Sequence, residues 1–258
     1  METRLAAIYN AWDSMELLPG SINSMIEHVD LVIIIFQKVS NFGERYNPLM
    51  DFDPSGFNEP NKIILAEYKP NFELGGTINE VRKRNIGLDI AREHKCSHFL
   101  HVDCDEYYEN FCALKEEYVQ AGYSGSVCPI YTYFKRPVWR LEEIDGYFVP
   151  FIHELRSDTK AGRSTYPYYC DPTRVINESD VVRLSQPMHH YSWVRKDIER
   201  KIRNSSAGQH GNKLQGLLSD YNSPELEANP EGFIIKDMGG QKIKIVPDLF
   251  GLSSLFSP

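Results

Sequence analysis

Six consecutive apolar residues, LVIIIF at positions 31–36, restrict the fold of this chain more than any other feature of its sequence. Most of them are β-branched and favour extended backbone. A strand without a polar side chain on either face is buried on both faces, as in a parallel sheet covered by helices. The run is far shorter than the roughly 20 residues that a membrane-spanning helix needs. We therefore predict a central strand at this position.

Strand-like and helix-like patterns alternate along the first half of the chain. Further strands are expected at 4–9, 62–68, 97–102 and 125–134, and helices at 14–28, 75–94 and 110–122. Thr77 and Glu80 have the spacing of a capping box and predict the start of the second helix. This order predicts an α/β protein with a mostly parallel sheet, whose ligands would gather at the carboxyl ends of the strands.

The second half of the chain has a less regular pattern. Strands are expected at 147–155, 173–176, 181–184 and 242–246, and a basic helix at 195–206. No Gly-, Pro- or Ser-rich linker divides the sequence. We predict a single domain over residues 1–258, with a first half at 1–110, a second half at 111–210 and a C-terminal extension at 211–258.

The strand expected at 97–102 runs directly into two aspartates, Asp103 and Asp105. In extended backbone, side chains two residues apart leave the same face of a strand. Two such carboxylates repel each other unless a cation lies between them. Mg²⁺ or Mn²⁺ would take oxygen ligands of this kind together with substrate phosphates. An aspartate-rich turn held by local hydrogen bonds is the alternative interpretation.

Basic and imidazole side chains elsewhere could serve the same site. Lys83 and Arg84 precede the aspartates on the expected helix and are either solvated charges or partners for phosphate. His189 and His190 follow a strand pattern. Paired histidines are commonly structural, although a neutral imidazole can also complete a metal site. Arg195 could offset the charge of a diphosphate.

Four stretches of the sequence resemble GT-A glycosyltransferases of the large family 2 kind. They are LAAIYNAWDSMELLPGSINSMI, LVIIIFQKVSN, VRKRNIGLDIAREHKCSHFLHVDCDEYY and MHHYSWVRKDIERKI. The third stretch is the most specific, because a basic helix feeds an apolar strand that ends in D-x-D. The resemblance implies a GT-A, Rossmann-like fold, in which a mostly parallel central sheet is flanked by helices and the acceptor side is less regular.

The resemblance also implies an enzyme that binds a nucleotide-sugar, most often UDP-linked, with Mn²⁺ or Mg²⁺. By position, the nucleotide-sugar would border Tyr9, Asn10, Gln37, Arg84, Asn85, Asp103 and Arg195. The metal ligands would be Asp103, Asp105 and either His190 or His189. Such enzymes often have an aspartate where this chain has Gln37, so the base is left open. Residues 1–110 would form the nucleotide-sugar half and residues 111–210 the acceptor and catalytic half.

Transfer of the sugar would need a carboxylate that deprotonates the acceptor hydroxyl, with inversion at the anomeric carbon. The carboxylates of the second half are candidates: Glu142, Glu143, Asp145, Glu154, Asp158 and Asp171. We favour Asp171, which precedes a proline and lies close to Arg174, and then Glu154. A simple turn aspartate is the alternative interpretation of Asp171.

Composition bears on the acceptor and on the setting of the protein. The chain has 36 acidic and 28 basic residues, a formal net charge of −8, and five cysteines without a CxxC pair. This favours a reducing, cytoplasmic setting (the host cytoplasm for a viral protein), without membrane insertion. A basic rim with aromatic neighbours could still bind an anionic polymer such as hydroxymethylated DNA; it comprises Lys135, Arg136, Arg140, Arg163, Arg195, Lys196, Arg200, Lys201 and Arg203. The net charge counts against DNA, which is the minority hypothesis for the acceptor; a glycan or a protein acceptor is open too, as is the oligomeric state.

Three other functions share some of these features. A nucleotidyltransferase has similar sheet topology, but it usually has an early glycine-rich phosphate loop, which IYNAWDSMELLPGS does not supply. A D-x-D phosphatase carries its motif at the first strand, whereas Asp103 lies far into the chain. A non-catalytic nucleotide-sugar-binding module remains an alternative, and turnover of a UDP-sugar to UDP would exclude it.

Overall fold

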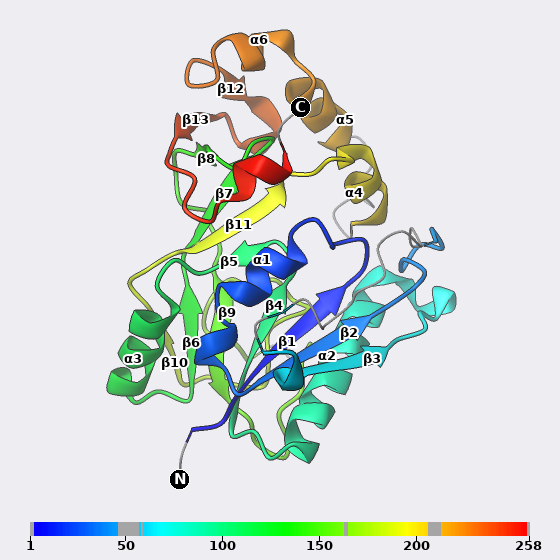
Figure 1. The fold of residues 1–258 in the computed structure, drawn as a ribbon, viewed down its shortest axis with the longest axis vertical. Coiled ribbons are helices and arrows are strands. Elements are labelled where there is room, and N and C mark those ends of the chain that lie inside the picture. Colours follow the sequence, from blue (N-terminus) through cyan, green and yellow to red (C-terminus); the bar gives the residue numbers. More distant parts are fainter. Residues whose placement is uncertain (1–2, 46–56, 58, 163–164, 206–212, 257–258) are drawn as a thin grey trace. The chain divides into compact units, whose positions relative to one another are not determined.

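A computed structural model of the chain describes residues 3–45, 57, 59–162, 165–205 and 213–256 (Figure 1). The chain forms two compact units, one of Met1–Pro129 with Gly146–Met188 and one of Ile130–Asp145 with His189–Pro258. The units alternate along the sequence, so their bounds differ from the consecutive segments expected above. That the two units make up one domain stays a prediction.

The first unit contains a seven-stranded sheet in the order β10-β6-β9-β4-β1-β2-β3. Strands β1 to β4 are parallel, β10 is parallel to β6, and only β9 runs antiparallel to its neighbours. The bounds are β1 Leu5–Ala11, β2 Leu31–Phe36, β3 Ile63–Glu67, β4 His98–Asp103, β6 Gly125–Cys128, β9 Val149–Glu154 and β10 Val181–Arg183. A short β5, Glu106–Tyr107, follows β4. The mostly parallel α/β fold is confirmed.

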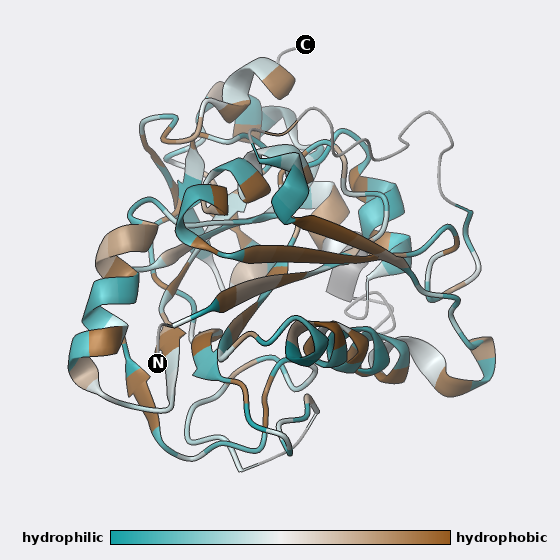
Figure 2. Cartoon of the chain, turned by 60° about the horizontal axis from the view of Figure 1, so that its bottom comes forward, coloured by the Kyte–Doolittle hydropathy of each residue, from teal (hydrophilic) through white to brown (hydrophobic). Residues whose placement is uncertain are grey.

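Helices pack on both faces of this sheet. They are α1 Leu18–Asn23, α2 Gly75–Glu93 and α3 Phe111–Ala121, with shorter turns η1 Ile26–His28, η4 Pro60–Lys62 and η5 Phe72–Leu74. In β1, Ile8 packs against Gly87 of α2, whereas the next residue, Tyr9, contacts Ser21 of α1. Figure 2 shows the hydrophobic strands with the long helix α2 along one side.

The sheet has a topological switch point between β1 and β4. Strand β1 pairs with β2 on one side and with β4 on the other, so the chain order reverses between β1 and β4. Asn10 is the register partner of Asp103, and both lie at the carboxyl ends of their strands. Ligands of open α/β sheets bind outside these ends, at such a switch point. The fold therefore marks this edge as the candidate site.

Helix α2 begins earlier than the capping-box pattern predicts. Its N-cap is Leu74 and its first residue is Gly75, so Thr77 is an exposed residue inside the helix and the capping-box interpretation is wrong. The fully buried amide of Asn79 organises the entry instead. Asn79 Oδ1 accepts from the Tyr68 hydroxyl at 2.6 Å and from Asn71 N at 2.9 Å, while Nδ2 donates to two carbonyls. A buried amide with all of these bonds made fixes the chain without a desolvation penalty.

The second unit is built on a separate sheet. Its strands are β7 Ile130–Phe134, β8 Trp139–Leu141, β11 Met188–Trp193, β12 Ile234–Ile235 and β13 Gln241–Ile245. Its helices are α4 Ile198–Asn204, α5 Lys213–Tyr221 and α6 Pro224–Ala228, with turns η7 Lys236–Met238 and η8 Leu252–Leu255. Phe134, Trp139, Ile202 and Ile243 belong to one apolar core. The expected C-terminal extension is thus part of this core.

One strand expected from the sequence is two strands in the structure. The run at 125–134 breaks at Pro129: β6 ends before it, at Cys128 in the first unit, and β7 begins after it, at Ile130 in the second. Proline has no amide hydrogen to continue a ladder, which explains the break.

The expected basic helix is present as α4, where Ile198 and Ile202 are buried one turn apart. Among the described residues, no helix is both long and apolar enough to cross a lipid bilayer.

Candidate functional site

The two aspartates of D-x-D do not share a strand face. Asp103 is the last residue of β4, and Cys104 and Asp105 form a turn that leads into β5. The side chain of Asp103 is 34% exposed, whereas Asp105 is buried. The expected same-face geometry is wrong here, because it requires extended backbone through both residues. Asp103 is therefore the member of the pair that opens to solvent.

A buried network of charges supports Asp103. Arg84 Nη2 of α2 lies 3.1 Å from Asp103 Oδ1, and Arg174 Nη2 lies 4.0 Å from the same oxygen. Arg174 also makes a bidentate pair with Glu106, at 2.5 and 2.6 Å, and both of these side chains are almost fully buried. Glu106 Oε2 in turn accepts from Asp103 N at 3.1 Å. Burying three charged groups is costly unless they are paired. Arg84, Arg174 and Glu106 are paired with one another or with the partly exposed Asp103, and these contacts hold the Asp103 carboxylate in place.

Two polar groups at the switch point have hydrogen-bonding capacity left over. Arg84 is 2% exposed, and its Nε and Nη1 have no hydrogen-bond partner among the described residues. The same holds for Asn10 Oδ1, although Asn10 Nδ2 approaches Glu80 O at 3.5 Å. Unpaired buried donors cost about 1–3 kcal/mol each. Such groups are commonly satisfied by a ligand, and two donors of a guanidinium suit an anion.

The buried face of α2 changes character along its length. Near its C-terminal end, Leu88 and Ala91 contribute to the core, and nearer the switch point the buried residues are polar, including Lys83 and Arg84. Burial lowers the pKa of Lys83 to about 8, against the attraction of Glu80 and Asp103. Burial raises the pKa of Glu80, opposed by Lys83 and Arg84 and reinforced by Asp103 and Asp171. Perturbed groups of this kind are typical of functional sites.

Asp171 belongs to the same cluster of charges as Glu80, with which it interacts. It also occupies a turn, because its Oδ1 accepts from Thr173 N at 2.8 Å and its carbonyl accepts from Arg174 N at 3.0 Å. The turn places Arg174 back toward Glu106. The turn interpretation of Asp171 thus holds, and it is compatible with a chemical role for the second carboxylate oxygen.

Two further predicted residues have other positions. Glu154 is exposed at the end of β9 and pairs in register with His98, the first residue of β4. Five residues of strand, about 17 Å, separate His98 from Asp103, so Glu154 lies at the opposite edge of the sheet. Asn85 clamps a loop, since its Oδ1 accepts from Ala161 N at 3.0 Å and its Nδ2 donates to Val81 O at 2.9 Å. Neither geometry favours the role expected from the sequence.

Of the two residues at the ends of β1 and β2 discussed next, Tyr9 belongs to the core and Gln37 could contact a ligand. Tyr9 is fully buried, and its hydroxyl lies 3.0 Å from Ser21 Oγ and donates to Met25 Sδ at 3.4 Å, so its side chain is core. Gln37 follows β2 at the carboxyl edge and is buried. Its Nε2 donates to Asn41 Oδ1 at 3.3 Å, and its Oε1 has no partner among the described residues. Gln37 resembles Asn10 in this respect.

The remaining candidates belong to the second unit. His189 is buried against Phe250 and bonds Tyr133 Oη through Nδ1 at 2.8 Å, and burial lowers its pKa to about 4. His190 is half-buried and interacts with Asp145. Arg195 donates to the carbonyls of Tyr191 and Val194. Within the described ranges, no three His, Cys, Asp or Glu side chains form a metal-binding cluster.

Parts of the expected basic rim have structural partners within the second unit. Lys135 and Arg136 both pair with Glu227, at 2.9 and 2.6 Å, and Arg140 lies over the ring of Tyr131. Arg163 lies outside the described residues. These pairings account for three of the cations without a polymer ligand.

Sequence reasoning missed the roles of Glu80 and Glu106. Glu80 stands three and four residues before Lys83 and Arg84, a spacing that places helical side chains together. Glu106 follows D-x-D directly, but only the fold shows that its partner is Arg174, 68 residues away.

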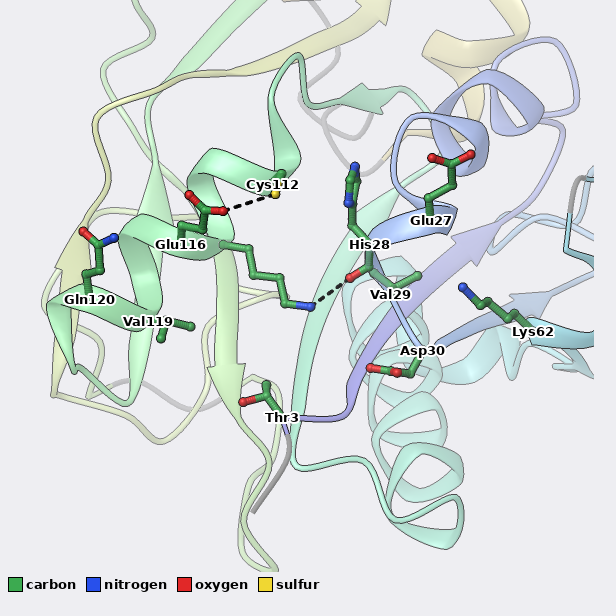
Figure 3. Close-up of a pocket in the computed structure, with 11 residues that line it drawn as sticks. Thr3, Glu27, His28, Val29, Asp30, Lys62, Cys112, Glu116, Val119 and Gln120 are labelled. Carbon is green, nitrogen blue, oxygen red and sulfur yellow. Dashed lines mark hydrogen bonds between the residues drawn. The ribbon is translucent and has the colours of Figure 1, made fainter.

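A separate pocket of about 550 Å³ lies at the amino ends of β1 and β2 (Figure 3). Thr3 and Asp30 precede these strands, and Cys112 and Glu116 of α3 form the other wall. Lys115 Nζ donates to His28 O at 3.0 Å. None of the residues predicted from the sequence lines this pocket.

Comparison with known proteins finds a distant structural similarity. No family profile and no curated protein sequence matches this chain. Similar solved structures include S. aureus TarS 1-349, with 12% identity over 89% of this chain and 75% of that chain and a TM-score of 0.46. Its complexes with UDP and with UDP-GlcNAc give 11% and 10% identity, 91% and 87% of this chain, 77% and 73% of the other, and TM-scores of 0.44 and 0.47. Likenesses of this size establish no shared function.

Proposed function

We propose that this chain is a glycosyltransferase that moves a sugar from a nucleotide-sugar, with UDP as the expected nucleotide, to an acceptor hydroxyl. The observation that carries the proposal is Arg84, a buried cation at the switch point beside Asn10 and Asp103, two of whose guanidinium nitrogens have no partner in the described part of the chain. A buried arginine with donors to spare suits the diphosphate of such a donor.

In this proposal some residues around Arg84 contact the phosphates of the nucleotide-sugar and others contact its nucleoside. Lys83 adds a second buried cation on the same helix. Asn10 Oδ1 and Gln37 Oε1 are acceptors at the ends of neighbouring strands, where they can receive hydrogen bonds from a ribose or a base. In this proposal Asp103 meets the ribose or a bound cation, while Tyr9 and Asn85 support the site from behind.

A divalent cation fits the donor set. Mg²⁺ is typically held by one or two carboxylates together with substrate phosphates, rather than by a complete protein cage. Asp103 is a partly exposed carboxylate of this kind, and Asp105, which is buried, follows it two residues later. When bound, Mg²⁺ or Mn²⁺ would neutralise the charge that develops on the leaving diphosphate. His190, His189 and Arg195 belong to the second unit, and the metal and diphosphate roles expected of them from the sequence stay predictions.

Asp171 is the proposed general base. Its carboxylate takes the proton of the acceptor hydroxyl, the acceptor oxygen forms a bond to the anomeric carbon, and the bond from that carbon to the diphosphate breaks. The bonding electrons leave with the nucleoside diphosphate. Attack from the face opposite the leaving group inverts the anomeric centre. Glu154 is not retained as a base, because it lies at the other edge of the sheet.

The test is a thermal-shift panel of UDP, GDP, CDP and their sugars, with and without Mn²⁺. A ligand of the native state raises the melting temperature. We expect a UDP-sugar to do so in wild type and to fail in Arg84→Met. If every nucleotide fails with metal present, the donor-binding proposal is wrong.

Product analysis separates the alternatives. A glycosyltransferase releases a nucleoside diphosphate, a nucleotidyltransferase releases pyrophosphate, and a binding module releases neither.

A further inference from the structure

Tyr169 presents an unusually open aromatic ring. Its side chain is 78% exposed, the highest value among the exposed large apolar side chains described. Tyr147 contacts it edge to face, with ring centroids 6.5 Å apart and planes at 80°. An exposed tyrosine offers a ligand much apolar contact area at little conformational cost.

The backbone places this ring at the edge of the candidate site. Phe148 N donates to Tyr169 O at 2.9 Å, and Phe148 bridges to Cys170 in parallel. Strand β9 begins at the next residue and runs antiparallel to β4, so its start lies toward the edge where β4 ends at Asp103. Asp171 follows Tyr169 by two residues. The ring is therefore close in the chain to the proposed base.

The residues next to Tyr147 and Tyr169 in the sequence pack against each other. The Phe148 ring packs against Tyr168 at 5.4 Å, with the Arg183 guanidinium 5.0 Å from its centroid. A platform that is already ordered costs little entropy when a ligand binds.

We propose that Tyr169, held by Tyr147, is an acceptor subsite that stacks on a neutral sugar ring, so that the acceptor is a glycan. This inference rests on the proposed function. The C–H bonds on one face of a sugar ring are weakly positive, and the face of an aromatic ring is negative, so the two attract. A polyanionic acceptor would need cations at the platform. The charged residue nearest to Tyr169 along the sequence is Asp171, a carboxylate, while the Arg183 guanidinium lies over the Phe148 ring, and the net charge of the chain is −8.

The experiment is saturation-transfer NMR on the full chain with neutral trisaccharides of glucose, galactose, mannose and N-acetylglucosamine, in the presence of UDP and diamagnetic Mg²⁺. We expect at least one trisaccharide to bind, with about fivefold to tenfold weaker affinity in Tyr169→Ala and near-wild-type affinity in Tyr169→Trp. Tyr123→Ala is the matched control, because Tyr123 is also exposed but precedes β6 at the opposite edge of the sheet. Its affinity should equal that of wild type.

Three results would overturn the inference while leaving the proposed function intact. The first is binding of UDP without binding of any trisaccharide, and the second is trisaccharide binding that Tyr169→Ala leaves unchanged. The third is binding of a hydroxymethylated DNA duplex that Tyr169→Ala abolishes, which would make the ring a base-stacking platform. Failure of wild type to bind UDP, by contrast, would contradict the proposed function itself.

Discussion

Asn10 and Asp103 are partners in the register of β1 and β4, at the point where the order of parallel strands reverses. The side-chain oxygen of Asn10, Oδ1, has no partner among the described residues. The carboxylate of Asp103 is ion-paired through one oxygen to Arg84. Polar side chains at the ends of two adjacent strands are thus brought together by strand pairing alone. The predictions below follow from this edge and from the charges that support it.

Replacing Arg84 should weaken nucleotide binding. Hydrogen bonds to charged groups contribute about 1.5–3 kcal/mol each, so Arg84→Met should lower the affinity for UDP by about 10- to 100-fold in titration calorimetry. Arg82→Met is the matched control, because Arg82 is an exposed cation on the same helix. Equal losses in the two variants would show that only the general positive charge matters.

Lys83 should make binding depend on pH. Its pKa is about 8, so its charge is lost as pH rises through that value, and affinity for a diphosphate should fall between pH 7 and pH 9.5. Titration calorimetry at both pH values would measure this. The dependence should be absent in Lys83→Met, and its persistence there would assign it to another group.

The same residue should link stability to pH with the opposite trend. Its folded-state pKa lies below the 10.5 of an unburied lysine, so between about pH 8 and 10.5 the unfolded chain binds more protons. The Lys83 contribution therefore destabilises the protein below pH 8, and this destabilisation is relieved as pH rises. Lys83→Met should raise the melting temperature at pH 7, and a lowered melting temperature would contradict the argument.

The Arg174–Glu106 pair should tolerate joint replacement better than single replacement. Removing one partner of a buried ion pair leaves an unpaired buried charge and costs about 3–5 kcal/mol. Glu106→Leu should therefore lower the melting temperature sharply, while Glu106→Leu with Arg174→Met should recover much of the loss. If the double variant is as unstable as the single one, the pairing is not what stabilises this region.

Gly87 should be restricted by packing. A Cβ at this position would lie 2.2 Å from Ile8 Cγ2, so Gly87→Ala must push α2 away from β1. Overpacking of this kind costs about 1–3 kcal/mol. Gly146→Ala is the control, because a Cβ there meets nothing within 4 Å. Comparable melting temperatures for the two variants would contradict the close approach of helix and sheet.

Replacing Asp171 should lower the rate of sugar transfer, whereas replacing Glu154 should not. General-base catalysis contributes roughly 100- to 10,000-fold, so Asp171→Asn should lower the rate of sugar transfer by that factor while UDP affinity stays unchanged. Glu154→Gln should have near-wild-type rates. If Glu154→Gln lowers the rate in a donor-turnover assay and Asp171→Asn does not, Glu154 and not Asp171 is the general base.

Local sequence patterns predicted the strands that position this site. The start of α2, the partner of Glu106 and the position of Glu154 depend instead on contacts between segments, and the sequence patterns did not predict them. The run at 31–36 and the strand ending at Asp103 are buried as expected, because hydrophobic continuity is a local property. The start of α2 was misjudged, because Asn79 and not Thr77 anchors it through bonds to Asn71 and Tyr68 that no local pattern encodes. The partnership of Arg174 with Glu106 depends on how distant segments fold together, as does the position of Glu154 opposite His98.

The break at Pro129 has a consequence for the order in which the protein folds during synthesis. The chain leaves the first unit there, returns at Gly146 and leaves again after Met188. The β7–β8 segment therefore emerges from the ribosome early, while Leu217 and Ile243, which share a core with its Phe134 and Trp139, emerge last. For the time needed to make about 100 residues, at 5–20 residues per second, these aromatic side chains have no native core to join. Nascent chains of this protein are accordingly expected to need a chaperone at this stage.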